Sequence, residues 1–164
     1  MKFIKITIIL SFTLLFICGF YKNYIVYDYK PIETKFNWGI VGARLLGSEK
    51  ESRNTITKGS PYELLVWFGS DTYIKGNIHI NNLKLIYNNS DNVAFVKHDI
   101  MTESIVKKTE NYRAYFSFNN IDISYDDMVL QIEFQLEQDG KLFDYITDLF
   151  FEKDYREFRR IIGV

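Results

Sequence analysis

The stretch that decides the fold is residues 128–151, which read MVLQIEFQLEQDGKLFDYITDLFF. Apolar residues in its first half alternate with polar ones, and they are Leu130, Ile132, Phe134 and Leu136. A period of two is typical of a strand with one buried face. Asp139-Gly140 then favours a two-residue hairpin turn, because both positions accept positive φ. The stretch therefore predicts an antiparallel hairpin.

A hairpin closed at Asp139-Gly140 has a definite register, in which two apolar faces meet. Its predicted pairs are Leu136 with Phe143, Phe134 with Tyr145, Ile132 with Thr147, and Leu130 with Leu149. A shift of one residue would set Asp144 and Asp148 opposite the apolar face. Turn and pattern thus specify the same pairing.

Period two also marks other parts of the chain. Tyr62, Leu64, Val66 and Phe68 share one face of a strand, and Trp67 helps to make the other face apolar, which predicts a central strand covered on both sides. Further strands are expected at residues 36–40, 74–87, 93–98 and 112–118, with a bulge or turn at Asn81-Asn82. Residues 47–60 are polar and bounded by Gly and Ser, which favours a loop.

The end of the sequence changes its period. Tyr155, Phe158 and Ile162 have helical spacing, which predicts a short amphipathic C-terminal helix. About seven short strands with polar links indicate an all-β fold, an antiparallel β-sandwich of immunoglobulin-like architecture. The Cys…Trp…Cys spacing of antibody domains is missing. Tyr125 fits either a tyrosine corner or, more simply, a packed or exposed tyrosine.

A charged and then apolar segment opens the chain. Lys2 and Lys5 precede the apolar run of residues 6–20, and Tyr21 and Lys22 close it. The apolar side chains that define a membrane segment are Ile6, Ile8, Ile9, Leu10, Phe12, Leu14, Leu15, Phe16, Ile17 and Phe20. With the flanking residues the run reaches the length of a transmembrane helix. Since lysines stay cytoplasmic, we expect a single-pass anchor with everything after Tyr21 outside.

Three alternatives to an uncut anchor stay open. A cleaved signal peptide would release a periplasmic or secreted domain, although the residues before the cut are not the small ones expected. A bacterial lipoprotein would be acylated at Cys18, where Leu15 fits the signal and Ile17 does not. A buried element of a soluble fold would normally show a polar face, and residues 6–20 have none.

Composition divides the chain and limits its partners. We expect an anchor at residues 1–21, a tether at 22–34 and one extracytoplasmic domain at 35–164. All 21 acidic residues follow Tyr21, while two of the 20 basic residues precede it, so the exported part carries a net charge of −3. No nucleic-acid partner is expected for such a surface. Cys18 is the one cysteine, so no disulfide bond stabilises the domain. An exported domain without disulfides suits a bacterial inner membrane and periplasm.

Residue patterns for chemistry are weak. His79 and His98 lie in strand-like segments without the carboxylates or thiolates of a metal site nearby in sequence. Gly69-Ser70-Asp71 has no base close to it in sequence.

The acidic cluster of Asp122, Asp126 and Asp127 lacks the glycine of a tight calcium loop, so a solvated loop is preferred. Lys107-Lys108 and Arg159-Arg160 are basic pairs for which a solvated surface is the first interpretation, with lipid or partner contact as the alternative for the C-terminal pair.

These observations favour a protein-binding module of a bacterial envelope. It would be held by the N-terminal helix, with no catalytic, metal or cofactor residues assigned, and its partner would be another envelope protein. One alternative is a small periplasmic hydrolase or metal-dependent enzyme, which requires His79 and His98 to converge with carboxylates. Another is a passive structural or lipid-contacting protein, which requires an exposed apolar patch or an open cavity between sheets.

Overall fold

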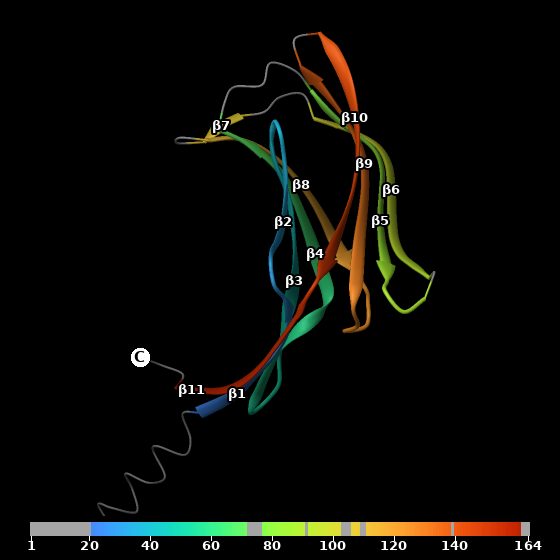
Figure 1. Ribbon diagram of the computed structural model, residues 1–164. Helices are drawn as coiled ribbons and strands as arrows, with labels where there is room; N and C mark the ends of the chain where they lie inside the picture. The colour runs from blue at the N-terminus through green and yellow to red at the C-terminus, as the bar shows by residue number, and fades with distance from the viewer. Residues whose placement is uncertain are drawn as a thin grey trace, which may run out of the picture.

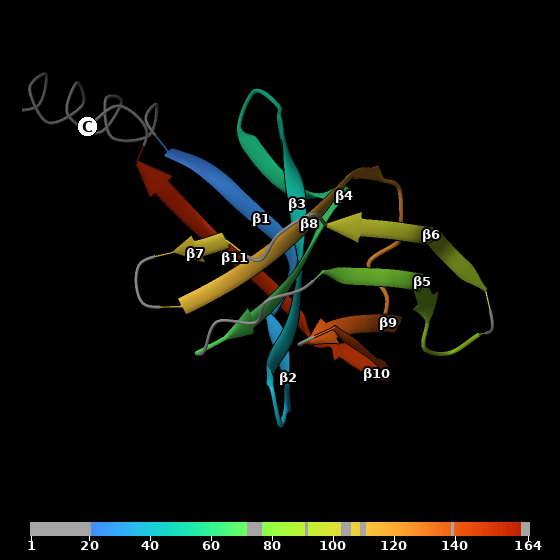
Figure 2. The same ribbon diagram turned by 90° about the horizontal axis from the view of Figure 1, so that it is seen from above.

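The computed structural model describes residues 21–71, 77–90, 92–102, 106–108, 111–138 and 140–161. In this part of the chain the regular elements are all strands, arranged in two sheets (Figure 1, Figure 2). The strands are β1 (Tyr21–Tyr29), β2 (Ile32–Phe36), β3 (Gly39–Glu51), β4 (Thr55–Ser70), β5 (Ile78–Tyr87), β6 (Val93–Thr102), β7 (Val106–Lys108), β8 (Asn111–Ile121), β9 (Met128–Gln138), β10 (Lys141–Phe151) and β11 (Lys153–Ile161).

The larger, 7-stranded sheet is organised around β4. Its main path is β11-β1-β4-β3-β2, and β8 pairs with both β4 and β7. One edge of β4 pairs with β3, while the other edge changes partner along its length. It pairs first with β1, in parallel from Asn23↔Thr55 to Val26↔Lys58, and then with β8. The smaller, 4-stranded sheet has the antiparallel order β10-β9-β5-β6.

One core fills the space between the two sheets. Alternate residues of β4, including Leu64 and Phe68, face those of β9, including Ile132 and Phe134, and all four are buried. The rings of Phe68 and Phe134 approach edge to face with centroids 4.9 Å apart. Burial of apolar residues on one face of each sheet is the source of stability in a sandwich. The predicted all-β fold of two packed sheets is confirmed.

The hairpin predicted from residues 128–151 is present in the predicted register. β9 and β10 pair along their whole length, with Leu136↔Phe143, Phe134↔Tyr145, Ile132↔Thr147 and Leu130↔Leu149. Gly140 has a φ of 75°, in the left-handed region that glycine enters without strain. Asp139, the other residue of the turn, lies outside the described residues.

The central position of β4 is also confirmed. Its second apolar face carries Trp67, which is buried over Gly42 of β3. A Cβ at position 42 would lie 2.2 Å from the indole ring, so only glycine leaves room for it. The indole Nε1 donates a hydrogen bond of 3.2 Å to the carboxylate of Glu33.

The predicted C-terminal helix is wrong, because residues 153–161 form strand β11. β11 pairs antiparallel with β1 over its whole length. Cross-strand aromatic pairs hold it there: Tyr24 stacks on Phe158 at 5.3 Å, and Tyr27 contacts Tyr155 at 5.4 Å. The helical spacing of a few aromatic residues was overridden by pairing with a strand distant in the sequence.

The predicted tether at residues 22–34 is likewise wrong, since it forms β1 and most of β2. Asp28 of β1 is 3% exposed and accepts hydrogen bonds from Lys58 Nζ at 2.8 Å and Gly47 N at 3.3 Å. Arg156 of β11 lies 3.7 Å from the same carboxylate. A buried charge with these partners belongs to a folded domain, not to a linker.

Two smaller expectations also change. The strand expected at residues 36–40 is interrupted by a turn at Asn37 and Trp38 between β2 and β3. Residues 47–60, expected as a loop, form most of an extended hairpin between β3 and β4. In residues 47–60 polar side chains occupy strand positions that mostly face solvent, so polarity alone did not mark a loop.

The predicted membrane segment lies outside the described residues. It was predicted for residues 1–21, of which residues 1–20, including Cys18, are not described, whereas Tyr21 begins strand β1. Within the part of the chain that is described, no helix has the length and apolar character needed to cross a membrane.

Candidate binding sites

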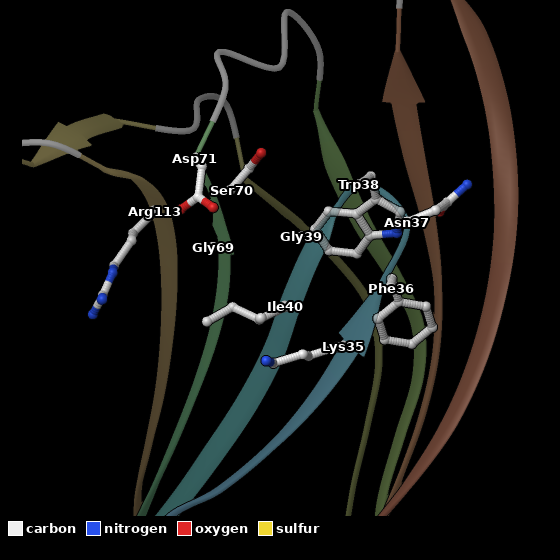
Figure 3. Close-up of a pocket in the computed structure, with 10 residues that line it drawn as sticks. All are labelled: Lys35, Phe36, Asn37, Trp38, Gly39, Ile40, Gly69, Ser70, Asp71 and Arg113. Carbon is white, nitrogen blue, oxygen red and sulfur yellow. The ribbon is translucent and has the colours of Figure 1, made fainter.

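A pocket of about 380 Å³ opens where the β2–β3 turn meets the end of β4. Figure 3 shows its lining, in which side chains from β2, β3, β4 and β8 surround one hollow. The lining residues are Lys35, Phe36, Asn37, Trp38, Gly39, Ile40, Gly69, Ser70, Asp71 and Arg113. Sheet register brings them together, because Ile40 pairs with Gly69 and Gly69 pairs with Arg113 across three adjacent strands.

Aromatic rings form the wall of this pocket next to the smaller sheet. Trp38 stacks between Phe36, at 5.6 Å, and Phe68, at 6.4 Å. Tyr145 of β10 meets the edge of Trp38 at 5.9 Å. The Nε1 of Trp38 is buried, and no hydrogen-bond partner for it is found among the described residues. The wall therefore combines packed aromatic rings with one N–H donor left unpaired by the residues that the structure describes.

The polar part of the lining carries groups of both charges. Lys35 and Arg113 supply cations, Asp71 supplies a carboxylate, and the Arg113 Nη1 donates to the hydroxyl of Tyr115 at 3.3 Å. Ser70, singled out in the sequence, does line the pocket and is buried. The lining residues include no histidine.

A second candidate is the outer face of β10. Leu142, Ile146 and Phe150 are 64%, 74% and 58% exposed, although each is a large apolar side chain. Asp144 and Asp148 stand between them on the same face and are also exposed. The result is an apolar stripe with two carboxylates set into it, which we call the β10 stripe.

The β10 stripe lies on an edge strand. β10 is the terminal strand of its sheet, and among the described residues it pairs with β9 alone. Such a strand presents unpaired backbone N–H and C=O groups along its outer edge. Strand β2, at the edge of the larger sheet, lies close by, since Tyr145 contacts Phe36 at 5.5 Å. The stripe and the pocket thus occur on the same side of the sandwich.

Acidic residues continue beyond β10 onto β9. Register places Glu133 opposite Ile146 and Glu137 opposite Leu142. Asp144 accepts a hydrogen bond of 2.8 Å from Gln135, which fixes that carboxylate beside the stripe. The outer face of β9 and β10 therefore combines exposed apolar side chains with negative charge.

The two histidines are not gathered into a site. His79 of β5 is opposite Met101, and His98 of β6 is opposite Asn82. The His79 Nε2 lies 3.9 Å from the carboxylate of the exposed Asp99. Neither histidine lines the pocket described above, and no group of three potential metal ligands occurs among the described residues.

The acidic cluster lies in the loop before β9, where Asp126 and Asp127 border an open hollow of about 420 Å³. Its members have separate protein partners. Asp122 accepts from the hydroxyl of Ser60, Asp126 from Ser124 Oγ at 2.5 Å, and Asp127 pairs with Lys153 at 3.3 Å. These contacts agree with the preferred interpretation of a polar loop.

Two buried tyrosines donate hydrogen bonds to backbone carbonyls, and one of these carbonyls belongs to that loop. Tyr29 donates its hydroxyl to the Asp126 carbonyl at 2.7 Å, and Tyr62 donates to the Tyr27 carbonyl at 2.6 Å. Burial raises the pKa of both phenols above the ordinary value of 10.0. Tyr125 packs against Tyr27 and Tyr29, each with centroids 5.2 Å away, as a packed tyrosine would.

Comparisons with family models, with curated proteins and with solved structures found no match for this chain. The sequence had pointed to Ser70 and the acidic loop, but not to the pocket or the β10 stripe. The stripe was detectable, because the register predicted for the hairpin already placed Leu142, Ile146 and Phe150 on the face away from the core.

Proposed function

We propose that this chain is a protein-binding module of a bacterial cell envelope. The apolar run of residues 6–20 would anchor it in the inner membrane, and the β-sandwich would lie in the periplasm and bind another envelope protein through β10. The exposed β10 stripe carries this proposal, because large apolar side chains on an edge strand mark an interaction surface. The apolar N-terminal run and the lack of cysteine after Cys18 support the location.

The partner is best described as an extended segment in which apolar and basic residues alternate. Such a segment can add to the free edge of β10 by backbone hydrogen bonds. Directly opposed residues of paired strands share a face, so an apolar residue would meet Ile146. Lysine or arginine two residues to either side would meet Asp144 and Asp148.

A second copy of this chain fits the same edge poorly. Antiparallel pairing of β10 with itself, centred on Ile146, would bring Leu142 to Phe150. It would also bring Asp144 opposite Asp148 twice, and opposed like charges destabilise a strand pair. Other registers of the same face would set a carboxylate against either an apolar side chain or another carboxylate. Charge therefore favours a basic partner.

The β10 stripe also bears on the lipid-contacting alternative, which requires an exposed apolar patch. Asp144 and Asp148 would enter the bilayer with that patch, at a high cost in desolvation. The enzyme alternative requires His79 and His98 to converge with carboxylates, and the described residues give it no such arrangement. Both considerations favour the protein-binding proposal.

We also propose an immunoglobulin-like architecture, in the general sense of two packed sheets. The two sheets and their edges available for contact support this proposal. The parallel pairing of β1 with β4 departs from the all-antiparallel arrangement expected.

Synthetic peptides test the proposal. The full chain in lipid nanodiscs would be titrated with a fluorescent peptide of alternating valine and lysine, and with a matched peptide of alternating valine and glutamate. We expect the lysine peptide to bind and the glutamate peptide to bind at least about tenfold more weakly, which is about 1.4 kcal/mol. The double variant Asp144→Lys with Asp148→Lys should reverse that preference.

Ile146→Lys should abolish binding of the lysine peptide, because it removes the central apolar contact and adds a like charge. Val96→Lys is the matched control, since Val96 is an exposed apolar residue on β6, at the far edge of the same sheet. Equal affinity for both peptides, equal effects of the two variants, or a dimer of the free protein that Ile146→Lys dissolves would each refute the proposal.

A further inference from the structure

One end of the domain gathers three parts of the chain that are distant in sequence. β1 starts there, β11 ends there, and the turn between β3 and β4 lies beside them (Figure 1). The contacts agree with the picture, because Tyr21 pairs with Ile161 and the Asn23 amide donates to the Asn54 carbonyl at 3.0 Å. The pocket lies at the other end, at the β2–β3 turn.

Basic residues are concentrated at this end, although the domain as a whole is acidic. The cations are Lys22, Lys50, Arg53, Arg159 and Arg160, and the acids are Glu49, Glu51 and Glu157. Lys22 forms an ion pair with Glu51. Among the described residues, no ion pair is formed by Arg53, Arg159 or Arg160, and all three are exposed.

Aromatic side chains accompany these arginines. Tyr21 and Phe158 are 40% and 44% exposed. Phe158 stacks on Tyr24, and the Arg160 guanidinium lies 5.9 Å from the Tyr24 ring centroid. Tyrosine and phenylalanine next to arginine are typical of side chains that meet the boundary between lipid headgroups and acyl chains.

The distance from the proposed membrane segment is short. Residue 20 immediately precedes Tyr21, and a strand rises about 3.3 Å per residue. Register places Arg160 opposite Lys22 and Arg159 opposite Asn23, so both arginines lie within about 10 Å of the end of that segment, which is one Debye length at moderate salt.

We propose that this end of the domain docks on the headgroups of an anionic bilayer, with Arg53, Arg159 and Arg160 contacting lipid phosphates. The proposal rests on the membrane anchor of the proposed function. It adds that the sandwich is held against the membrane by its cationic end and does not swing freely on its anchor. The pocket and β9–β10 turn then face away from the bilayer, where a partner can reach them.

Fluorescence quenching tests this orientation in the full chain. A Cys18→Ser background would carry a fluorophore at Asn54→Cys, in the β3–β4 turn, or at Asn37→Cys, in the β2–β3 turn at the opposite end. The protein would be reconstituted in vesicles of phosphatidylcholine, with or without phosphatidylglycerol, that contain a lipid with a nitroxide on its headgroup. We expect quenching at position 54 to rise with phosphatidylglycerol and quenching at position 37 to stay low.

Charge variants identify the contacts. Replacing one of these arginines should lower the equilibrium constant for docking about fivefold, and Arg159→Glu with Arg160→Glu should remove the effect of phosphatidylglycerol. Arg44→Glu with Lys97→Glu is the matched control, because both are exposed cations away from this end. Circular dichroism would confirm that each variant is folded.

The outcomes separate the two proposals. A chain that does not float with either kind of vesicle lacks the anchor, which would refute the location in the proposed function. A chain that floats, but whose label at position 54 is quenched equally with and without phosphatidylglycerol, would overturn the docking proposal alone. Equal loss of quenching in both charge variants would also overturn it.

Discussion

Phe134 is the residue at which most parts of the core meet. It is 1% exposed, and its ring contacts Phe68 of the opposite sheet at 4.9 Å and Tyr145 of β10 at 5.2 Å. It also meets Phe36 and Trp38 of the β2–β3 region, both at 6.0 Å. Substitution of Phe134 by alanine would therefore loosen β10 and the pocket wall together.

The size of the effect follows from these contacts. Truncation of a buried phenylalanine to alanine costs about 3–5 kcal/mol, because apolar burial is lost and a cavity remains. Four ring contacts, each worth about 0.5–1.5 kcal/mol beyond burial, place Phe134→Ala near the upper end of that range. For a domain of this size, a loss of 3–5 kcal/mol lowers Tm by about 6–20 °C.

Urea unfolding of the full chain, followed by far-ultraviolet circular dichroism, measures this loss. Phe150→Ala is the matched control, because Phe150 lies on the outer face of β10 and is largely exposed. We expect that control to lose about 1 kcal/mol or less. A loss below about 1 kcal/mol for Phe134→Ala, or equal losses for both variants, would mean that the ring is not buried between the sheets.

Two further predictions concern charge and pH. Asp28→Ala should lower the free energy of unfolding by about 1.5–3 kcal/mol, because Lys58 and Gly47 lose their hydrogen-bond acceptor. Asp148→Ala is the control, since Asp148 is exposed. Equal urea midpoints for the two variants would contradict this expectation. Above about pH 10 the unfolded chain should release phenolic protons that folded Tyr62 retains, because burial raises its pKa, so stability should fall by about 1.4 kcal/mol per pH unit for this residue. Tyr62→Phe should make the measured fall shallower by that amount, and an unchanged slope would show that Tyr62 is not protected.

The elements that were predictable from sequence are those whose reasons are local. The β9–β10 hairpin has its turn and both alternating faces within residues 128–151, so its register could be stated residue by residue. β4 could be placed as a central strand because Leu64 and Trp67 make opposite faces apolar. Each of these predictions needed only neighbouring residues.

The elements that were missed depend on partners far away in the chain. β11 is polar and locally ambiguous, and it becomes a strand because Tyr24 and Tyr27 of β1 provide stacking partners. The pocket needs Ile40, Gly69 and Arg113 to be aligned on three strands, which only the sheet register supplies. Sequence patterns contain no signal for such convergence.

Pairing of β1 with β11 sets the order in which the chain can mature. During synthesis, β1 emerges first but cannot complete its hydrogen bonding until residues 153–161 have followed every other strand. Contacts between residues so distant in sequence make folding slow, because loop closure precedes any gain in stability. In the proposed route of export, slow folding of the larger sheet would help to keep the chain competent for translocation. Loss of β11 would leave the edge of β1 open to other nascent chains, so we expect aggregation, rather than a partly active domain, to follow from truncation after Glu152.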